Sequence, residues 1–412
     1  MSAAPDGSFV QLKRLARLRY GDSLPEQDRI EGTTPVFGSN GPIGLHTSPN
    51  TGASVIVVGR KGSFGAVHYS DRPVFAIDTT FYIDPSTSSV DLRWLYYVLL
   101  SANLNTVSQD TGVPGLSREK THSHRVRLVS ELAQRQIADY LDAETGRIDA
   151  LISAKRDLQS ALSMKLQALI DARVSGDREP GERSMLGSRF FETLPQSWVL
   201  ARLRNVVRYR NSNVDKKMVE GAQRVRLCNY TDVYYGGYLD SSETFMEATA
   251  SDEEVRRFRL REGDVIVTKD SETAADIGVP AYVAANLDAV CGYHLTILTP
   301  GPLLNGEYLY WAMKSSMLSG YFETAANGVT RFGLTQQGIG DAPIPVPPLA
   351  TQRQIAKDLR RSSLVVSEMS KAVDRQILLL MEYRQTLITS TVTGETPLPP
   401  DWAAAEMEEI AS

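Results

Sequence analysis

The chain has 412 residues, of which 42% are hydrophobic and 23% charged, a composition typical of a globular protein large enough for two or more domains. It has no apolar run long enough to cross a bilayer and no basic, apolar leader, so we expect a cytoplasmic protein. Cys228 and Cys291 have no His or Cys near them at metal-ligand spacing, which argues against a disulfide framework or a zinc site.

The net charge of −5 argues against a nucleic-acid partner for the chain as a whole, but it averages over unlike segments. Residues 10–21 carry four basic side chains and no acid, and residues 200–226 carry eight basic side chains against two acids. The two segments also resemble each other, because Arg14-Leu-Ala-Arg-Leu-Arg-Tyr20 is similar to Arg202-Leu-Arg-Asn-Val-Val-Arg-Tyr209. Phosphate binding depends on local charge, so each segment is either a nucleic-acid surface or a solvated face of a helix or strand.

Residues 1–130 are rich in turn residues and in short β-branched or aromatic runs. These runs predict strands at residues 54–58, 75–83 and 125–129. A helical stretch at residues 92–104 lies between them. The mixture indicates an α/β or α+β domain with many loops.

The remainder of the chain alternates long helices with a second mixed segment. Residues 131–176 have the periodicity of one long helix, and residues 177–190, without periodicity and rich in Gly, Arg, Glu and Ser, are predicted to be a linker. Residues 191–348 repeat the mixed pattern. A second long helix is predicted for residues 349–393, followed by a C-terminal tail at 394–412.

The two long helices are copies of one unit. The run Leu132-Ala-Gln-Arg-Gln-Ile-Ala138 returns as Leu349-Ala-Thr-Gln-Arg-Gln-Ile-Ala356. From Gln134 to Gly176 the second copy follows the first at a constant offset of 218 residues, since Gln134 corresponds to residue 352 and Gly176 to residue 394. Self-similarity at a fixed offset indicates a duplicated structural unit.

Apolar residues in both helices recur in alternating steps of four and three. Counted from Ile137, seven of ten positions are apolar, and from Ile355 eight of ten are apolar. A seam of period 3.5 predicts a coiled coil, here an antiparallel pair of the two helices. At about 1.5 Å per residue each helix would span about 65 Å and would hold the mixed domains at a fixed distance. The predicted seam includes Leu151, Leu158, Met369 and Tyr383.

The second helix opens with Pro348-Leu-Ala-Thr-Gln-Arg-Gln-Ile-Ala356, and the first with a shorter form that has Glu131 in place of the proline. Near the end of each mixed segment, Thr111-Gly-Val-Pro-Gly-Leu116 corresponds to Asn327-Gly-Val-Thr-Arg-Phe332. With these motifs, the chain resembles the specificity subunit of a type I restriction–modification enzyme over nearly its whole length. That family opens each helix with Pro-Leu-x-x-Gln-x-x-Ile-Ala, and the first copy departs from it only at the entry turn.

The resemblance implies two target-recognition domains, at residues 1–130 and 191–348, that each read one half of a bipartite, asymmetric DNA site. Loop side chains would read bases while phosphate contacts set the register. The candidate DNA contacts are Lys61, Ser63, Arg118 and Lys120 in the first domain, Lys269, Asp270, Thr330 and Arg331 in the second, and Arg14, Arg17, Arg202 and Arg208 as backbone contacts. Glycine-rich turns also serve strand geometry, and a loop arginine also forms surface ion pairs, so a structural role is open for each. Because the two loops differ, we expect different half-sites.

The resemblance implies as partners double-stranded DNA, two adenine-methyltransferase subunits and restriction/translocase subunits, and no membrane. The sequence has neither Gly-x4-Gly-Lys-Ser/Thr nor Asn/Asp-Pro-Pro-Tyr/Phe, so we expect S-adenosylmethionine, ATP and Mg on the partners, no cofactor here and no catalytic residue. His122 and His124 flank Ser123 in an alternating segment and are expected at the surface rather than in a catalytic or ligand role.

Two other classes of function remain open. The chain could be a coiled-coil adaptor whose mixed domains bind proteins, which the acidic total charge favours. It could also be the recognition subunit of a related system, type IIB-like or phage-exclusion, with another enzymatic partner. A neighbouring gene for an adenine methyltransferase would favour DNA specificity, and an isolated gene would favour the adaptor.

Overall fold

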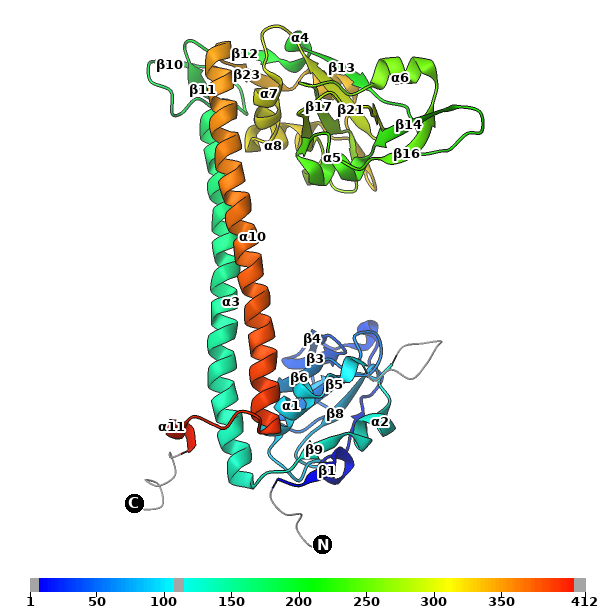
Figure 1. The fold of residues 1–412 in the computed structure, drawn as a ribbon, viewed down its shortest axis with the longest axis vertical. Coiled ribbons are helices and arrows are strands. Elements are labelled where there is room, and N and C mark those ends of the chain that lie inside the picture. Colours follow the sequence, from blue (N-terminus) through cyan, green and yellow to red (C-terminus); the bar gives the residue numbers. More distant parts are fainter. Residues whose placement is uncertain (1–6, 107–114, 404–412) are drawn as a thin grey trace. The chain divides into compact units, whose positions relative to one another are not determined.

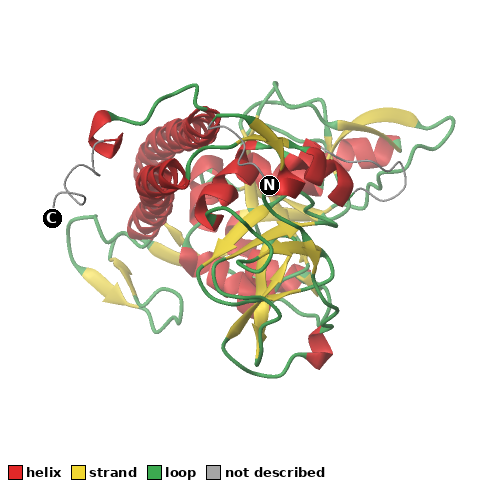
Figure 2. Ribbon diagram, turned by 90° about the horizontal axis from the view of Figure 1, so that it is seen from below, coloured by secondary structure: helices red, strands yellow, loops and turns green. Residues whose placement is uncertain are grey.

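The structure is a computed structural model that describes residues 7–106 and 115–403. The chain divides into two compact units (Figure 1): unit 1 holds the residues up to 156 and from 373 onward, and unit 2 holds residues 157–372. Each unit therefore contains one mixed domain and part of both long helices. The predicted fold class, mixed α/β domains combined with two long helices, is confirmed (Figure 2).

Unit 1 is built around a buried, β-branched strand. Its strands are β1 (Phe9–Gln11), β2 (Arg19–Tyr20), β3 (Thr34–Gly38), β4 (Gly41–His46), β5 (Val55–Gly59), β6 (Val67–Ser70), β7 (Phe75–Ala76), β8 (Thr80–Ile83) and β9 (Arg125–Arg127). They form sheets of order β2-β8-β5-β6 and β4-β3-β7, and a β1-β9 pair. All five residues of β5 are buried, which is why this run of valine and isoleucine forms a central strand.

Helix α1 (Leu92–Ser101) packs on this sheet of unit 1, and α2 (Arg118–Ser123) follows later in the chain. The Asp91 side chain accepts a hydrogen bond from the Trp94 backbone N–H at 2.8 Å and so starts α1. Trp94, Leu95 and Leu99 are fully buried. The helix predicted for residues 92–104 therefore exists but ends at Ser101.

Unit 2 repeats this plan with more elements. Its strands are β10 (Arg183–Met185), β11 (Thr193–Pro195), β12 (Val199–Arg202), β13 (Val207–Asn211), β14 (Gln223–Cys228), β15 (Tyr238–Leu239), β16 (Met246–Ala250), β17 (Val265–Thr268), β18 (Asp270–Ser271), β19 (Pro280–Val283), β20 (Val290–Cys291), β21 (Leu295–Pro300), β22 (Phe332–Gly333) and β23 (Pro343–Val346). Its short helices are α4 (Leu203–Val206), α5 (Tyr230–Gly236), α6 (Asp252–Phe258), α7 (Gly306–Met313), α8 (Ser316–Ala325) and α9 (Gln336–Gly340). The main sheets have the orders β13-β21-β17-β19-β15 and β16-β14-β20.

The duplication seen in the sequence is also present in the topology. In unit 1, β8 lies between β2 and β5, and in unit 2, β21 lies between β13 and β17, with antiparallel pairing throughout. A pair of terminal strands closes each domain, β1 with β9 and β12 with β23. The strand β23 or β9 then leads into a long helix. Each domain is therefore one copy of the same framework.

The long helices are α3 (Glu131–Val174) and α10 (Leu349–Thr393), and the short α11 (Pro400–Ala403) follows in the tail. In each unit, residues later in α3 contact residues earlier in α10. In unit 1, Arg384 Nε donates to Asp149 Oδ1 at 3.0 Å, and Lys155 Nζ donates to Gln376 Oε1 at 2.6 Å. In unit 2, Arg173 Nη2 donates to Asp358 Oδ2 at 2.9 Å, and Gln159 Nε2 donates to the Ser370 carbonyl at 3.4 Å. The predicted antiparallel pairing is therefore observed in both units.

The seam between the helices differs from the predicted one at every second position. Leu151, placed in the seam, is 52% exposed, whereas its neighbour Ile152 is only 7% exposed. Leu158 and Tyr383 are exposed as well. The predicted seam and the observed buried face of α3 share residues 148, 155 and 162. Between these residues, each predicted seam position lies one residue before the position that is buried. Steps of three and four residues alternate along such a helix face, and a repeat of 3.6 residues per turn does not fix which step comes first after a given residue. The prediction took the step of three first because that step ends on leucines, which are exposed in the structure.

Other local predictions also need correction. The segment 177–190, predicted to be a linker, contains β10, which pairs with β11. Arg183 holds this pair to the end of α3, because its guanidinium donates to the Gly176 carbonyl at 2.8 Å. His122 and His124 are half-buried rather than exposed, because the segment around them forms α2 and its C-terminal turn.

Candidate nucleic-acid interface

The first basic segment forms one wall of a groove in unit 1. The groove has a volume of about 1040 Å³ and is lined by the basic side chains Lys13, Arg14, Arg17, Arg19 and Arg118. Within the described part of the chain, no acidic side chain lines it. The structure thus brings the predicted residues Arg14, Arg17 and Arg118 together in a surface suited to phosphate groups.

An exposed tyrosine lies between two arginines at the edge of this groove. The Arg60 guanidinium carbon is 5.1 Å from the centre of the Tyr20 ring, and that of Arg118 is 5.0 Å from it. The Tyr20 ring is 47% exposed and contacts the Phe81 ring at 4.9 Å. Arg60 is fixed further by donating from Nη2 to the Asp78 carbonyl at 2.7 Å. Two oriented cations beside an exposed ring are suited to contact phosphates or base edges.

The positive charge around α2 also explains the state of His122. Burial, and then the positive charges of Arg118, Lys13 and Arg17, lower the pKa of His122. Its Nε2 accepts a hydrogen bond from the Leu18 backbone N–H at 3.1 Å, which requires an unprotonated nitrogen. His122 therefore supports the wall of the groove, and its role is structural.

The predicted loop residues Lys61 and Ser63 follow the central strand β5 and are exposed. Lys61 pairs with Gly115, and the Leu116 N–H donates to the Arg60 carbonyl at 2.9 Å. The glycine motif at residues 111–114 lies outside the described residues. Lys120, on α2, is half-buried like Arg118, and in the described residues no contact joins it or Ser63 to the groove.

In unit 2, three of the four predicted loop residues lie in one cluster. His294 Nδ1 is 2.7 Å from Asp270 Oδ2 and 3.3 Å from Arg331 Nη2. Lys269 Nζ lies over the Tyr293 ring at 4.7 Å from its centre. Thr330 is exposed next to Arg331 and makes no contact in the described part of the structure that ties it to the cluster.

The two loop clusters occupy equivalent places in the two copies of the framework. In unit 1, Leu116 donates to the Arg60 carbonyl, and in unit 2 Leu334 donates to the Lys269 carbonyl at 2.8 Å. The neighbouring pairs also correspond, because Lys61 pairs with Gly115 and Asp270 with Gly333. The backbone is thus repeated, while a lysine in the first copy is replaced by an aspartate in the second.

The second basic segment has surroundings that differ from those of the first. Arg202 Nη1 lies 3.2 Å and Arg204 Nη1 2.8 Å from Asp341 Oδ1, so one acid partly neutralises both. Arg210 donates to the Arg257 carbonyl at 2.6 Å and to Thr299 Oγ1 at 2.9 Å, so it supports the fold. Arg208 is exposed and, in the described residues, has no ion pair. Similar sequences therefore have different surroundings in the two units.

Sequence reasoning missed several residues that the fold brings to these clusters. Tyr20 lies at the end of the first basic segment and Arg60 directly precedes Lys61, so both could have been added to the candidate DNA contacts. His294 carried no signal, because it reaches Asp270 only through the pairing of neighbouring strands. The tyrosines of α5, among which Tyr230 and Tyr234 stack at 5.6 Å and Tyr235 is exposed, were also missed.

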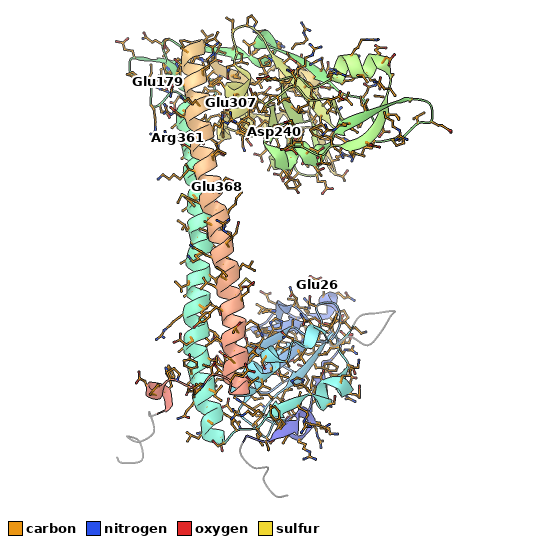
Figure 3. The ribbon with its side chains drawn as sticks, viewed as in Figure 1. Glu26, Glu179, Asp240, Glu307, Arg361 and Glu368 are labelled. Atoms are coloured by element: carbon orange, nitrogen blue, oxygen red, sulfur yellow. The ribbon has the colours of Figure 1, made fainter. Side chains whose placement is uncertain are left out.

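Both long helices expose apolar side chains to solvent. In unit 2 these are Leu158, Met164, Leu364, Val365 and Met369, and in unit 1 they are Leu132, Leu151, Leu378, Leu379, Met381 and Tyr383. Around them, exposed charged residues such as Arg361 and Glu368 (Figure 3) are mixed with the apolar ones. Apolar side chains exposed at several levels of both helices are available for a protein–protein contact.

Other kinds of site are not found among residues 7–106 and 115–403. No group of three or more His, Cys, Asp or Glu side chains there is arranged to hold a metal ion. None of the described helices is long and apolar enough to span a membrane. Cys228 and Cys291 are free and buried, and burial raises the pKa of both thiols.

Comparison with known proteins decides the family. The family model described as type I restriction modification DNA specificity domain matches residues 8–157 and 198–372, which is most of the chain. The chain belongs to this family. Both mixed domains, with parts of the helices that follow them, therefore carry a type I DNA specificity domain, which confirms the identification from sequence.

Two relatives from Escherichia coli are similar along most of their length. The type I restriction enzyme EcoBI specificity subunit is 19% identical over 401 residues, which cover 93% of this chain and 81% of the relative. The EcoDI specificity subunit is 18% identical over 425 residues, which cover 98% and 92%. A solved chain from work on complex assembly and conformational transition of the type I R-M system has a TM-score of 0.70 at 16% identity, covering 96% of this chain and 100% of that one. This likeness concerns the fold.

Proposed function

We propose that the chain is the DNA sequence-specificity subunit of a type I restriction–modification complex and that it reads a bipartite, asymmetric site. The observation that carries the proposal is the pair of loop clusters at equivalent places in two copies of one domain. Because the two loop clusters lie at equivalent positions, both domains meet DNA in the same way. Because the side chains of the two clusters differ, the domains read different bases. The basic groove of unit 1 supplies phosphate contacts.

The chain contributes specificity rather than catalysis. Adenine methylation requires the target base outside the stack, so the subunit's part is to position methyltransferase subunits, two in number, on the two half-sites. The exposed apolar side chains of α3 and α10 support docking of these subunits. Restriction/translocase subunits complete the complex, and S-adenosylmethionine, ATP and Mg bind to the partners. Because host DNA is the target, the complex works in the cytoplasm.

The experiment that tests the function is co-expression of this chain with the methyltransferase encoded beside it, followed by single-molecule mapping of methylated adenines across the host genome. The expected result is a split motif, methylated only when this chain is present. Methylation that is absent, or unchanged when the chain is omitted, would instead favour a protein-binding adaptor or a related system with another enzyme.

A further inference from the structure

The loop cluster of unit 2 contains an imidazole whose orientation is fixed by a carboxylate. His294 directly precedes β21, Asp270 lies in β18, and their side chains meet at 2.7 Å between Nδ1 and Oδ2. The Lys269 N–H donates to the His294 carbonyl at 3.1 Å, so the backbone fixes the pair as well. Both side chains are about one quarter exposed, 27% for His294 and 25% for Asp270.

This contact determines which nitrogen of His294 carries the proton. An ionised Asp270 can only accept a hydrogen bond, so Nδ1 must be the donor. The guanidinium of Arg331 also has only donors, and its 3.3 Å approach to Nδ1 places it beside the imidazole–carboxylate pair without a bond to that nitrogen. In the neutral ring, Nε2 is then a hydrogen-bond acceptor. In residues 7–106 and 115–403 no protein partner for His294 Nε2 is found.

The acceptor His294 Nε2, with the cationic donor Arg331 beside it, matches particular base edges of DNA. In the major groove, adenine offers its N6 amino group as donor beside N7 as acceptor, and cytosine offers its N4 amino group. Guanine and thymine offer no amino donor there. His294 Nε2 can accept from an amino group while Arg331 donates to a neighbouring acceptor or phosphate.

We propose that His294, oriented by Asp270, is a specificity-determining residue of the second domain and reads the exocyclic amino group of adenine or cytosine at one base pair of its half-site. This inference rests on the proposed function as a DNA specificity subunit. The first domain lacks this imidazole–carboxylate pair. Thr79, whose carbonyl accepts a hydrogen bond from the Arg60 N–H at 2.8 Å, takes the position of His294, and Lys61 takes that of Asp270. The half-site of the first domain is therefore read differently.

The test uses the complete methyltransferase complex carrying this chain and duplexes with every single base-pair change in each half-site. The wild-type complex should discriminate at the base pair in question by roughly 10- to 100-fold in affinity, the usual cost of one mismatched base pair. His294→Ala should reduce that discrimination to less than about threefold at this base pair alone, since the other base contacts remain. Genome-wide mapping should show the same single position becoming degenerate.

Asp270→Asn provides a second variant with a different expected result. The Asn side chain offers Nδ1 either its amino group or its carbonyl oxygen, so it no longer fixes the ring proton on Nδ1, and Nε2 becomes a donor whenever the amino group faces Nδ1. The preference for adenine or cytosine at the same position should then weaken, and guanine or thymine should be accepted more often. Lys61→Ala is the matched control, because it changes the equivalent loop of the first domain and should leave the second half-site unchanged.

The inference is overturned if both variants assemble and recognise the same sequence as the wild type. It is equally overturned if discrimination falls at all base pairs of the half-site together, which is the result expected from a merely structural role. Should His294→Ala fail to assemble, Asp270→Asn alone decides, through the presence or absence of the change in base preference. Failure of the proposed function is distinct, because then the wild-type complex itself has no split motif.

Discussion

At the scale of single residues, the clearest candidate for a phosphate contact is Arg118, beside Tyr20 in the groove of unit 1. Replacing it by alanine should weaken DNA binding about tenfold, for cognate and unrelated duplexes alike, and should reduce the salt dependence by about one counterion. Fluorescence anisotropy of the assembled complex over a series of salt concentrations measures both quantities.

Arg72→Ala is the control for this change, because it removes one exposed arginine of the same unit that does not line the groove. The control should leave the salt dependence almost unchanged. Equal losses from both variants would show that binding responds only to net charge, and the groove would then have no special part in it.

The half-buried position of His122 makes unit 1 sensitive to acid. Because burial and nearby cations lower its folded pKa below the usual value of 6.5, the folded state binds the proton less readily than the unfolded chain. Its contribution to stability is therefore present above pH 6.5 and is lost as the pH falls through the lowered pKa.

Thermal unfolding measured between pH 7.5 and 5 should show this loss, and His122→Asn should reduce its slope with pH. The pKa values of His68 and His124 are also lowered by burial, so part of the slope should remain in the variant. An unchanged slope in His122→Asn would mean that His122 does not titrate with unfolding.

The site residues show what the sequence could and could not predict. Lys61 and Arg118 were predicted because they follow a strand and a glycine motif, and the structure brings their loops together through the Leu116–Arg60 hydrogen bond. His294 could not be predicted, because only the pairing of strands places it against Asp270. Local sequence contains strand propensity and turn residues but not the register between distant strands.

At the scale of elements, the repeated glutamine of the helix-opening motif has a definite function. Gln352 is fully buried, accepts from the Asn305 N–H at 2.7 Å and donates to the Leu303 and Pro347 carbonyls at 2.9 and 2.7 Å. In unit 1, Gln134 likewise accepts from the Asp91 N–H and donates to the Val129 carbonyl. Each glutamine thus ties the start of α1 or α7 to the start of a long helix.

Gln352→Ala should destabilise unit 2 by about 3 kcal/mol, because it leaves several buried backbone groups without partners. Gln354→Ala, two residues further on, is the matched control, since Gln354 is exposed and, among the described residues, its side chain bonds only to Asp358. Chemical denaturation of both variants gives the comparison. Similar stabilities would show that the glutamine motif is not needed to join domain and helix.

The corrected helix seam makes a second prediction from neighbouring residues. Ile152 belongs to the core of unit 1, so Ile152→Ala should lower the free energy of unfolding by about 2 to 4 kcal/mol. Leu151→Ala, at an exposed position, should change it by less than about 1 kcal/mol but should weaken binding of the methyltransferase subunit. Denaturation of the free chain and titration with the partner separate the two effects.

The helices themselves were predictable because their apolar period extends over many turns, which is a strong signal. Their exact contact face was not, because steps of three and four can be interchanged without changing the average period. The linker prediction at residues 177–190 was wrong because nothing in the local sequence indicates the strand found there. Its strand β10 is short and half-exposed, and Arg183, rather than an apolar pattern, holds it in place.

At the scale of the whole molecule, positive charge is concentrated in one place although the net charge is negative. The total of −5 coexists with a groove that, in the described residues, is lined by cations and no acid. A net negative chain opposes unspecific binding to DNA, while the local cations bind phosphate where the loop clusters can read bases. The duplicated framework then allows the two half-sites to differ through loop residues alone.

The same framework predicts that helix length sets the distance between half-sites. Lys155 of α3 contacts Gln376 of α10, so one heptad inserted into each helix near Lys155 and Val373 keeps the seam in register. Each insertion adds about 10.5 Å, which corresponds to about three base pairs of DNA. Mapping of methylated adenines should show a spacer longer by about that number with both half-sites unchanged. The rate of methylation should fall, because three base pairs also rotate one half-site by about 100° relative to the other. The same heptad in α3 alone breaks the pairing and should abolish methylation, and a changed half-site in the double insertion would show that the helices influence base reading as well as spacing.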